Sequence, residues 1–310
     1  MRQSYVFFIW LIVAVPALAQ SNAVFPNGAS FGLLPFEGSR PAENFSGFMN
    51  PETLASVMIA ELPVDAADQV MNGFRSAASL AQQGIIASDY KELVVSGRPA
   101  LQLKGTQQAQ GLGPFPKCVV IVKGRSATGI ITAQMPLEQE GDACRLIQGL
   151  AERAAPGLNN KVSALPFRIT ALGDMRIQDT LSGSVAILTR RDADPKTGPI
   201  MVIAHSLSQA AIMPATAEQM LISRQMLSGT TNVTAISIEA ETTLKIDGSP
   251  ATQIIATGII PKQNRQVRLV QWVRFSQSGS TIRLYGESDQ STFDGNFAIF
   301  TTVKDGLKVP

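Results

Sequence analysis

Histidine and cysteine are scarce in this sequence: its 310 residues contain one histidine, His205, and two cysteines, Cys118 and Cys144. A structural zinc site usually needs four nitrogen or sulfur ligands, so we expect no metal site. Charged residues make up only 16% of the chain, and the formal net charge is +2. A general nucleic-acid binder needs clustered lysine and arginine, so this balance argues against nucleic acid as a partner. The sequence also lacks the glycine loops that bind nucleotide phosphates, and we therefore expect no cofactor.

Long apolar runs are missing except at the N-terminus. There, a basic start is followed by an apolar run at 5–15 and by Pro16-Ala-Leu-Ala19. This pattern is typical of a secretory signal peptide, residues 1–19, with cleavage after Ala19. The run is shorter than the ~20 residues that a membrane anchor needs. We therefore expect a periplasmic or secreted protein with no transmembrane segment in the mature chain.

The two cysteines can be interpreted in two ways. An oxidising compartment favours a disulfide, and Cys118 and Cys144 are expected at neighbouring ends of a hairpin and the element that follows it. Such a bond would stabilise the fold by about 3 kcal/mol in the chain-entropy model. The alternative is two separate buried thiols. A catalytic pair is not indicated, because the C-x-x-C spacing is absent.

An internal repeat organises the chain. Residues 93–102 read LVVSGRPALQ and residues 244–253 read LKIDGSPATQ, which gives five identities at a shift of 151. The same shift aligns Pro63 with Pro214, each just ahead of a helical pattern, and it aligns two later hairpins. We therefore predict two domains of one fold, residues 20–155 and 162–310, joined by a linker at 156–161.

Each half predicts the same elements in the same order: a strand, a helix, two hairpins and a last helix. In the first half, the helices are expected after Asp65, ending near Gly84, and over 143–154. In the second half, Thr216 begins a capping box, Gly229 ends that helix, and a C-terminal helix carries Phe293, Phe297, Phe300 and Leu307. Consecutive hairpins imply an antiparallel sheet, and the helices imply α+β packing in layers.

Three features together resemble a known family. They are Phe45-Ser-Gly-Phe48, the strand and helix over 56–83, and the turn Val95-Ser-Gly-Arg-Pro-Ala100. In this order they are similar to the PsbP-like family, shared with the Ran-binding Mog proteins. The resemblance covers most of 30–155 and, more weakly, 162–310. It implies two tandem α/β/α sandwich domains, each an antiparallel sheet with helices on its faces, used for binding rather than catalysis. No ligand motif of that family is matched.

Catalytic patterns are weak. His205 is the one possible histidine base, and it ends an apolar strand, where a packed imidazole is the simpler interpretation. Gly28-Ala-Ser30-Phe-Gly32 matches a nucleophile elbow, but Leu33-Leu-Pro-Phe36 follows it instead of a helix. The segment 192–198 has two carboxylates near a glycine but lacks the other ligands of a calcium loop. We expect a non-enzymatic binding or accessory protein of the bacterial cell envelope; the alternatives are an envelope serine hydrolase using His205, or a small-molecule carrier.

The candidate partner site lies in the second half, where no acidic residue occurs between Gly248 and Gly286. If the hairpin turns at Ser278-Gly279, Arg274 opposes Arg283, and an anionic partner would relieve their repulsion. Arginine with aromatic residues is also typical of interface hot spots. We predict an at least partly exposed surface that binds a protein or an anionic envelope component; it consists of Arg268, Trp272, Arg274, Arg283 and Tyr285.

Overall fold

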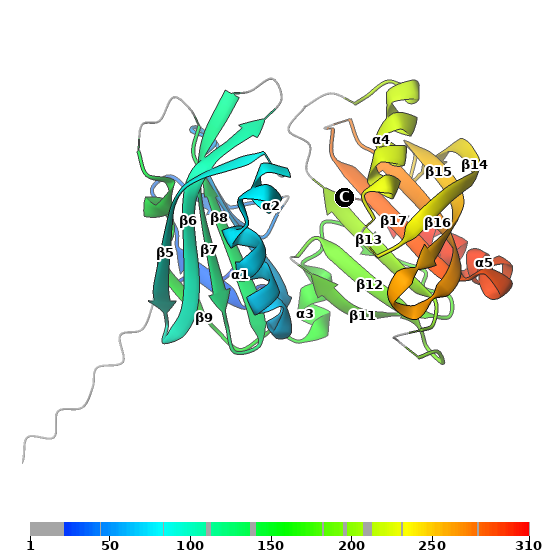
Figure 1. Ribbon diagram of the computed structural model, residues 1–310, viewed down its shortest axis with the longest axis horizontal. Coiled ribbons are helices and arrows are strands. Elements are labelled where there is room, and N and C mark those ends of the chain that lie inside the picture. The colour runs from blue at the N-terminus through cyan, green and yellow to red at the C-terminus, as the bar shows by residue number, and fades with distance from the viewer. Residues whose placement is uncertain are drawn as a thin grey trace, which may run out of the picture.

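The structure is a computed structural model, and it describes residues 22–43, 45–82, 84–109, 113–136, 141–181, 183–194, 197–206, 213–230, 232–277 and 279–309. The predicted signal peptide lies outside the described residues. Two seven-stranded antiparallel sheets stand side by side (Figure 1). This confirms the predicted fold class of two α+β domains.

The first sheet has the strand order β2-β3-β4-β8-β7-β6-β5. Its strands are β2 (Arg40–Pro41), β3 (Gly47–Met49), β4 (Ser56–Pro63), β5 (Ile85–Val95), β6 (Arg98–Ala109), β7 (Gly113–Lys123) and β8 (Ala127–Gln134). The second sheet has the order β11-β12-β13-β17-β16-β15-β14. Its strands are β11 (Met175–Leu181), β12 (Val185–Arg190), β13 (Ile200–Ser206), β14 (Thr234–Ile246), β15 (Ser249–Ile260), β16 (Arg265–Phe275) and β17 (Thr281–Asp289). The two orders are equivalent, strand for strand.

The repeat also extends to local backbone geometry. Ser96 and Gly97 have φ of 49° and 75°, and Asp247 and Gly248 have φ of 46° and 75°. Two successive residues with positive φ make the tight turn that matches strand twist, and glycine is favoured at the second. Both edge strands also carry a bulge at the equivalent place, between 87 and 89 in β5 and between 238 and 240 in β14. The sequence repeat is therefore a repeat of structure.

One face of each sheet is covered by the helix that follows the third strand. In the first domain this helix is broken into α1 (Ala67–Arg75) and α2 (Ala77–Gln82), with the extended residue Ser76 between them. The predicted single helix after Asp65 is thus wrong in detail, since Asp65 lies in a preceding 3-10 turn. In the second domain the helix is α4 (Thr216–Ser228), capped by the residue before Thr216, without a side-chain hydrogen bond.

The opposite faces are covered differently. In the second domain α5 (Phe293–Asp305) lies across the sheet, and Phe293 and Phe300 enter the core, so this domain is an α/β/α sandwich. Figure 1 shows α5 on the outer side of the second sheet and α1 on the side of the first sheet that faces the second domain. Leu307, expected at the end of this helix, lies in the short strand β18 (Leu307–Lys308), which pairs with β10 (Arg168–Ile169).

The predicted helix over 143–154 is wrong. A 3-10 helix, Ala143–Leu146, is followed by β9 (Gln148–Glu152), which pairs with β1 (Phe31–Leu34). The apolar spacing resembled a helix, but Gly149 adopts a φ of 59°, which ends any helical course. The first sheet is therefore covered on this face by strands and a short turn. A helix, α3 (Leu158–Ser163), occupies part of the predicted linker.

Candidate functional site

The predicted partner surface depends on the register of β16 and β17, and that register differs by one residue. Trp272 pairs with Leu284, and Arg274 pairs with Ile282, not with Arg283. The predicted opposition of the two arginines was wrong because Phe275 pairs with Thr281, with five residues between them, whereas the predicted register would pair Phe275 with Ile282 across six residues. A shift of one residue moves every side chain of a strand to the other face.

The five predicted residues consequently lie on two different faces. Arg268, Trp272 and Arg274 share the α5 face. Trp272 is fully buried there, with its ring 5.9 Å from that of Phe297. Tyr285 is buried on the α4 face, in the cluster that includes Leu227 of α4. The expectation of one exposed face is therefore wrong, since a helix lies over each side.

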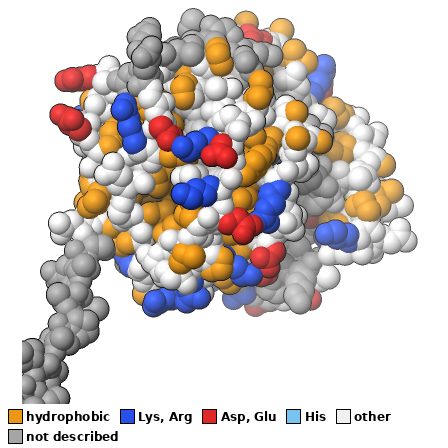
Figure 2. All heavy atoms as spheres, turned by 60° about the vertical axis from the view of Figure 1, so that its left-hand side comes forward, with side chains coloured by type: hydrophobic (Ala, Val, Ile, Leu, Met, Phe, Trp, Pro, Cys, Tyr) orange, Lys and Arg blue, Asp and Glu red, His pale blue; other side chains and the backbone are white. Residues whose placement is uncertain are grey.

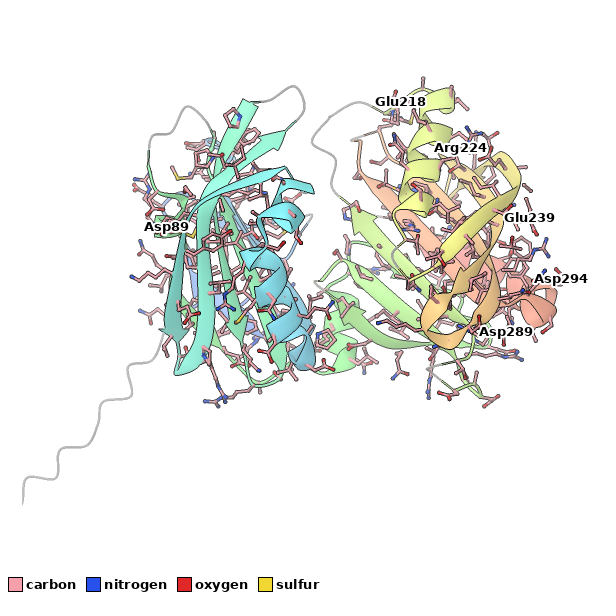
Figure 3. The ribbon with its side chains drawn as sticks, in the orientation of Figure 1. Asp89, Glu218, Arg224, Glu239, Asp289 and Asp294 are labelled. Carbon is pink, nitrogen blue, oxygen red and sulfur yellow. A yellow bond between two sulfur atoms is a disulfide. The ribbon has the colours of Figure 1, made fainter. Side chains whose placement is uncertain are left out.

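The arginines of this group also have partners. Arg268 donates to Glu239 at 2.7 Å and to Asp294 at 3.1 Å, and the two acids approach it from β14 and α5 (Figure 3). Arg274 is 8% exposed and donates to the carbonyl of Ile246. Burial lowers the pKa of Arg274. Arg268 is thus neutralised and Arg274 is buried, so neither arginine of the predicted partner surface offers a free positive charge.

Arg283 and Tyr285 form a polar row on the α4 face. The guanidinium of Arg283 lies 5.2 Å from the ring centre of Tyr285 and donates to the hydroxyl of Thr230. The hydroxyl of Tyr285 donates to Glu287 at 2.7 Å. Burial, reinforced by the neighbouring charge of Glu287, raises the pKa of Tyr285 well above its usual range. The phenol of Tyr285 therefore stays neutral over the physiological pH range.

The disulfide is confirmed. Cys118 and Cys144 are bonded, with their Cα atoms 5.0 Å apart. Cys118 lies fully buried within β7, and Cys144 lies in the 3-10 helix, whose first turn is closed by a hydrogen bond from the backbone N–H of Cys144 to Asp142. The bond therefore fastens the short covering segment to the first sheet.

The residues of the possible hydrolase are arranged differently from a nucleophile elbow. Ser30 precedes strand β1, is fully buried, and donates its hydroxyl to Glu61 at 2.9 Å. His205 ends β13 and is half-buried, and no hydrogen bond reaches its Nδ1 from the described residues. Burial, with a smaller effect of nearby Arg274, lowers the pKa of His205. Because Ser30 is fully buried, its hydroxyl is not exposed in the way that the serine of a nucleophile elbow is.

A cavity at the junction of the two domains is the better candidate site. Its volume is about 480 Å³. Residues far apart in the sequence line the cavity. The wall from the first domain is formed mainly by the end of β4, and the wall from the second domain is formed mainly by β11. Its charged residues are Glu61, Asp65, Lys161 and Asp179. Domain junctions are frequent places for binding sites.

Three carboxylates and one ammonium give this junction cavity a negative balance. Glu61 is held by the backbone N–H groups of Ser30 and Phe31. Lys161 of α3 donates to Asp179 at 3.4 Å. Asp65 makes no hydrogen bond or ion pair among the described residues. The cavity therefore favours a positively charged group over an anion.

Sequence reasoning had no means of finding this cavity. Its lining comes from the N-terminal segment, β4, α3 and β11, which share no motif or spacing. The described residues contain no group of three or more histidine, cysteine or acidic side chains arranged to hold a metal. None of the helices in the described part of the chain has the length and apolar character needed to cross a bilayer.

On the first domain, the outer side mixes both charge signs. Figure 2 shows basic and acidic side chains interspersed with apolar ones, without a large patch of either sign. One of these pairs, Lys104 with Asp142, is 2.6 Å apart. Such a surface gives no electrostatic preference for an anionic partner.

Comparison with known proteins gives fold-level likenesses only. No family model matches the chain, and no curated protein is significantly similar to it. Among solved structures, LpqN of Mycobacterium tuberculosis, involved in cell envelope biogenesis, is 13% identical over 46% of this chain and 83% of that chain, with a TM-score of 0.38. CyanoP, the PsbP of the cyanobacterium Synechocystis, is 12% identical over 46% and 95%, with a TM-score of 0.29. The immunity protein TplEi of the Pseudomonas aeruginosa T6SS is 8% identical over 88% and 98%, with a TM-score of 0.30. At these scores the argument for function depends on the geometry of the chain itself.

Proposed function

We propose that this chain is an exported, non-enzymatic binding protein of the bacterial cell envelope, built from two PsbP-like domains that hold a partner at their junction. The observation that carries the proposal is the junction cavity, whose walls come from both domains and whose charge is negative.

An extracytoplasmic location is supported by two independent features. The Cys118–Cys144 disulfide is stable in an oxidising compartment. The N-terminal sequence has the basic, apolar and small-residue regions of a signal peptide. Together they favour the periplasm or secretion.

The charge of the cavity favours one of the two expected partner classes. An anionic envelope component would approach Asp65 and Asp179 unfavourably. A protein segment that presents lysine or arginine would be attracted to them, and the attraction would weaken with salt. We therefore favour a basic segment of an envelope protein.

Affinity capture from the organism's own envelope extract tests this function. The variant Asp65→Asn with Asp179→Asn should capture about tenfold less of the same partner than the natural chain. Asp68→Asn is the matched control, since Asp68 is an exposed acid of α1 that bridges Lys123 and does not line the cavity. Equal capture by the double variant and the control would refute the proposed site.

A further inference from the structure

The second sheet ends in a long edge strand, β14. It is the last strand in the order of that sheet, and Figure 1 shows it on the side away from the first domain. Its two bulges lie between Thr234 and Ala240, so residues 240–246 pair with β15 without interruption. Thr242, Thr243 and Lys245 are exposed in this regular run. A regular, exposed edge strand is a template for pairing with another strand.

The other edges of the two seven-stranded sheets are less suited to such pairing. β2 has two residues, and Pro41 has no N–H to donate. β11 lines the junction cavity and is interrupted by a bulge between 177 and 179. β5 has a regular run at 89–95, the equivalent of 240–246, but Glu92 lies where Thr243 lies in β14. Two copies of β5 paired antiparallel about Glu92 would place two carboxylates directly opposite each other, which is destabilising.

The turn that follows β14 decides which of its backbone groups face outward. In a two-residue hairpin the residues that flank the turn exchange hydrogen bonds, and here these are Ile246 and Ser249. Lys245 comes next and faces Pro250, which has no N–H, so this pair is not hydrogen-bonded. The two kinds of pair alternate along the strand. The outward N–H and C=O groups of the regular run therefore belong to every second residue: Glu241, Thr243 and Lys245.

These three residues carry charges that match their own reversed order. Glu241 and Lys245 lie two residues on either side of Thr243. Antiparallel pairing of two copies about Thr243 therefore places Glu241 of each copy opposite Lys245 of the other. A pairing centred one residue later would place Glu241 opposite Asp247, and one centred one residue earlier would place Lys245 against the bulge before Ala240. The register about Thr243 uses the whole regular run and pairs unlike charges.

Glu241 is held in place as an anion, and Lys245 has no partner. Arg224 of α4 donates to both carboxylate oxygens of Glu241, at 2.7 and 2.5 Å. These hydrogen bonds lower the pKa of Glu241, and its oxygens keep lone pairs for a further donor. Lys245 makes no hydrogen bond or ion pair among the described residues. The two residues are about 13 Å apart along an extended strand, so they cannot pair within one chain.

We propose that this chain forms a symmetric dimer through β14, in which the second sheets of two copies join into one continuous antiparallel sheet. Its three outward residues form three hydrogen-bonded pairs, which supply about six backbone hydrogen bonds. An ion pair of Glu241 with Lys245 lies on each side of the two-fold axis, since each copy supplies the same residues to such an interface. The dimer surface is separate from the junction cavity, because no residue of β14 lines that cavity.

Sedimentation equilibrium of the chain from residue 20 onward, from about 5 μM to about 500 μM, tests the proposal; we expect a monomer–dimer equilibrium within this range. Lys245→Glu should weaken the dimer by about tenfold or more, because Glu241 then faces a like charge. Lys91→Glu is the matched control and should leave the dimer unchanged, since Lys91 is an exposed residue of the other long edge strand, β5. A chain that is monomeric throughout the range, or a dimer that Lys245→Glu leaves intact, overturns the proposal.

A charge exchange tests the register. Glu241→Lys alone should be monomeric, but an equal mixture of Glu241→Lys and Lys245→Glu should dimerise, because every lysine then faces a glutamate of the other copy. Thr243→Pro should abolish the dimer of the natural charges, because it removes an outward N–H that the fold itself does not use. Thermal melts confirm that each variant folds.

If the folded variants do not dimerise when mixed, or if folded Thr243→Pro still dimerises, the register is refuted. Partner capture at the domain junction should be the same for Lys245→Glu and the natural chain, so the two proposals fail separately.

Discussion

The disulfide compensates for a covering helix that the first domain lacks. Cys118 pairs with Lys104 in the first sheet as Val270 pairs with Ile255 in the second, so Cys118 occupies the place of Val270. Above Val270 lies the thirteen-residue helix α5. Among the residues that the structure describes, Cys118 is covered by a four-residue 3-10 helix and a short pair of strands. We therefore predict that removing the bond selectively destabilises the first domain.

The perturbation is the double variant Cys118→Ala, Cys144→Ala. The bond closes a loop with a sequence separation of 26 residues, for which the chain-entropy model gives about 3.5 kcal/mol at 25 °C. For a domain of this size, that loss lowers the melting temperature by about 10 °C. Removing two small buried side chains adds little to this effect, since Cβ is retained.

The chain contains a natural reporter for the other domain. Its tryptophans are Trp10, within the predicted signal peptide, and Trp272, in the core of the second domain. In the chain from residue 20 onward, tryptophan fluorescence therefore follows the second domain, whereas far-UV circular dichroism follows both. On urea titration, the dichroism should show an earlier transition in the double variant, while the fluorescence midpoint stays in place. Reductant should reproduce the effect in the natural chain and have none in the variant. The reasoning fails if the fluorescence midpoint moves as far as the dichroism, or if neither moves.

Three further predictions concern the repeat, the core and the histidine. Gly97→Ala and Gly248→Ala should each cost about 1–2 kcal/mol in chemical denaturation, since both have a φ of 75° and open space around an added Cβ; unequal costs would contradict the structural repeat. Trp272→Ala should cost about 3–5 kcal/mol, because it empties a fully buried site; a cost near zero would show an exposed ring. Burial and Arg274 lower the pKa of His205, so the unfolded chain binds its proton at higher pH, and stability should fall as pH drops below about 6.5. His205→Gln should flatten this slope between about pH 7 and pH 5, and an unchanged slope would contradict the assignment.

The domain architecture was predictable because it is encoded in turn chemistry and repeated. The Gly-x-Pro-Ala pattern marks the same tight turn twice, and a single shift aligned it with helix starts and hairpins. The consecutive hairpins also predicted an antiparallel sheet, which each domain has, but not the pairing of β4 with β8 or of β13 with β17. The disulfide was one of two interpretations left open for Cys118 and Cys144, favoured by their placement beside the same hairpin, and the structure has it.

The surface was less predictable, because it depends on single-residue details. A difference of one residue in the register of β16 and β17 exchanged the faces of Arg283 and Tyr285 relative to Trp272. Gly149 turned an apolar helical spacing into a strand. The junction cavity has no signal in the sequence, since it is assembled from segments that meet only after folding.

The equivalence of the sheets also separates residues that the fold requires from residues that it does not. Tyr285 pairs with Gln271 in the second sheet, and Thr132 pairs with Val119 at the equivalent place in the first sheet. The polar row of the second sheet therefore has equivalents in the first: Arg283 corresponds to Ile130, Tyr285 to Thr132, and Glu287 to Gln134.

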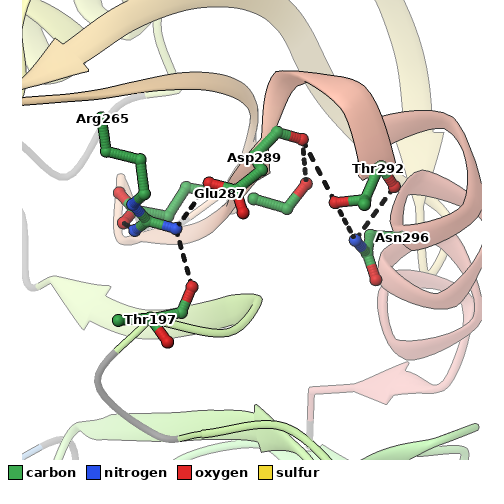
Figure 4. A network of polar contacts seen from close by, with 7 residues as sticks. Thr197, Arg265, Glu287, Asp289, Thr292 and Asn296 are labelled. Carbon is green, nitrogen blue, oxygen red and sulfur yellow. Dashed lines mark hydrogen bonds and ion pairs between the residues drawn. The ribbon is translucent and has the colours of Figure 1, made fainter.

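The first sheet forms without these charges, and burying them has a desolvation cost. Glu287 is nevertheless 4% exposed in the second sheet, where it contacts Tyr285 and Arg265. Arg265 of β16 in turn donates to Asp289 at the end of β17 and to the carbonyl of Thr197, which precedes β13 (Figure 4). The polar row therefore connects β16 and β17 to the segment before β13 through Arg265, a link that is not required for a sheet of this strand order, because the first sheet forms without it.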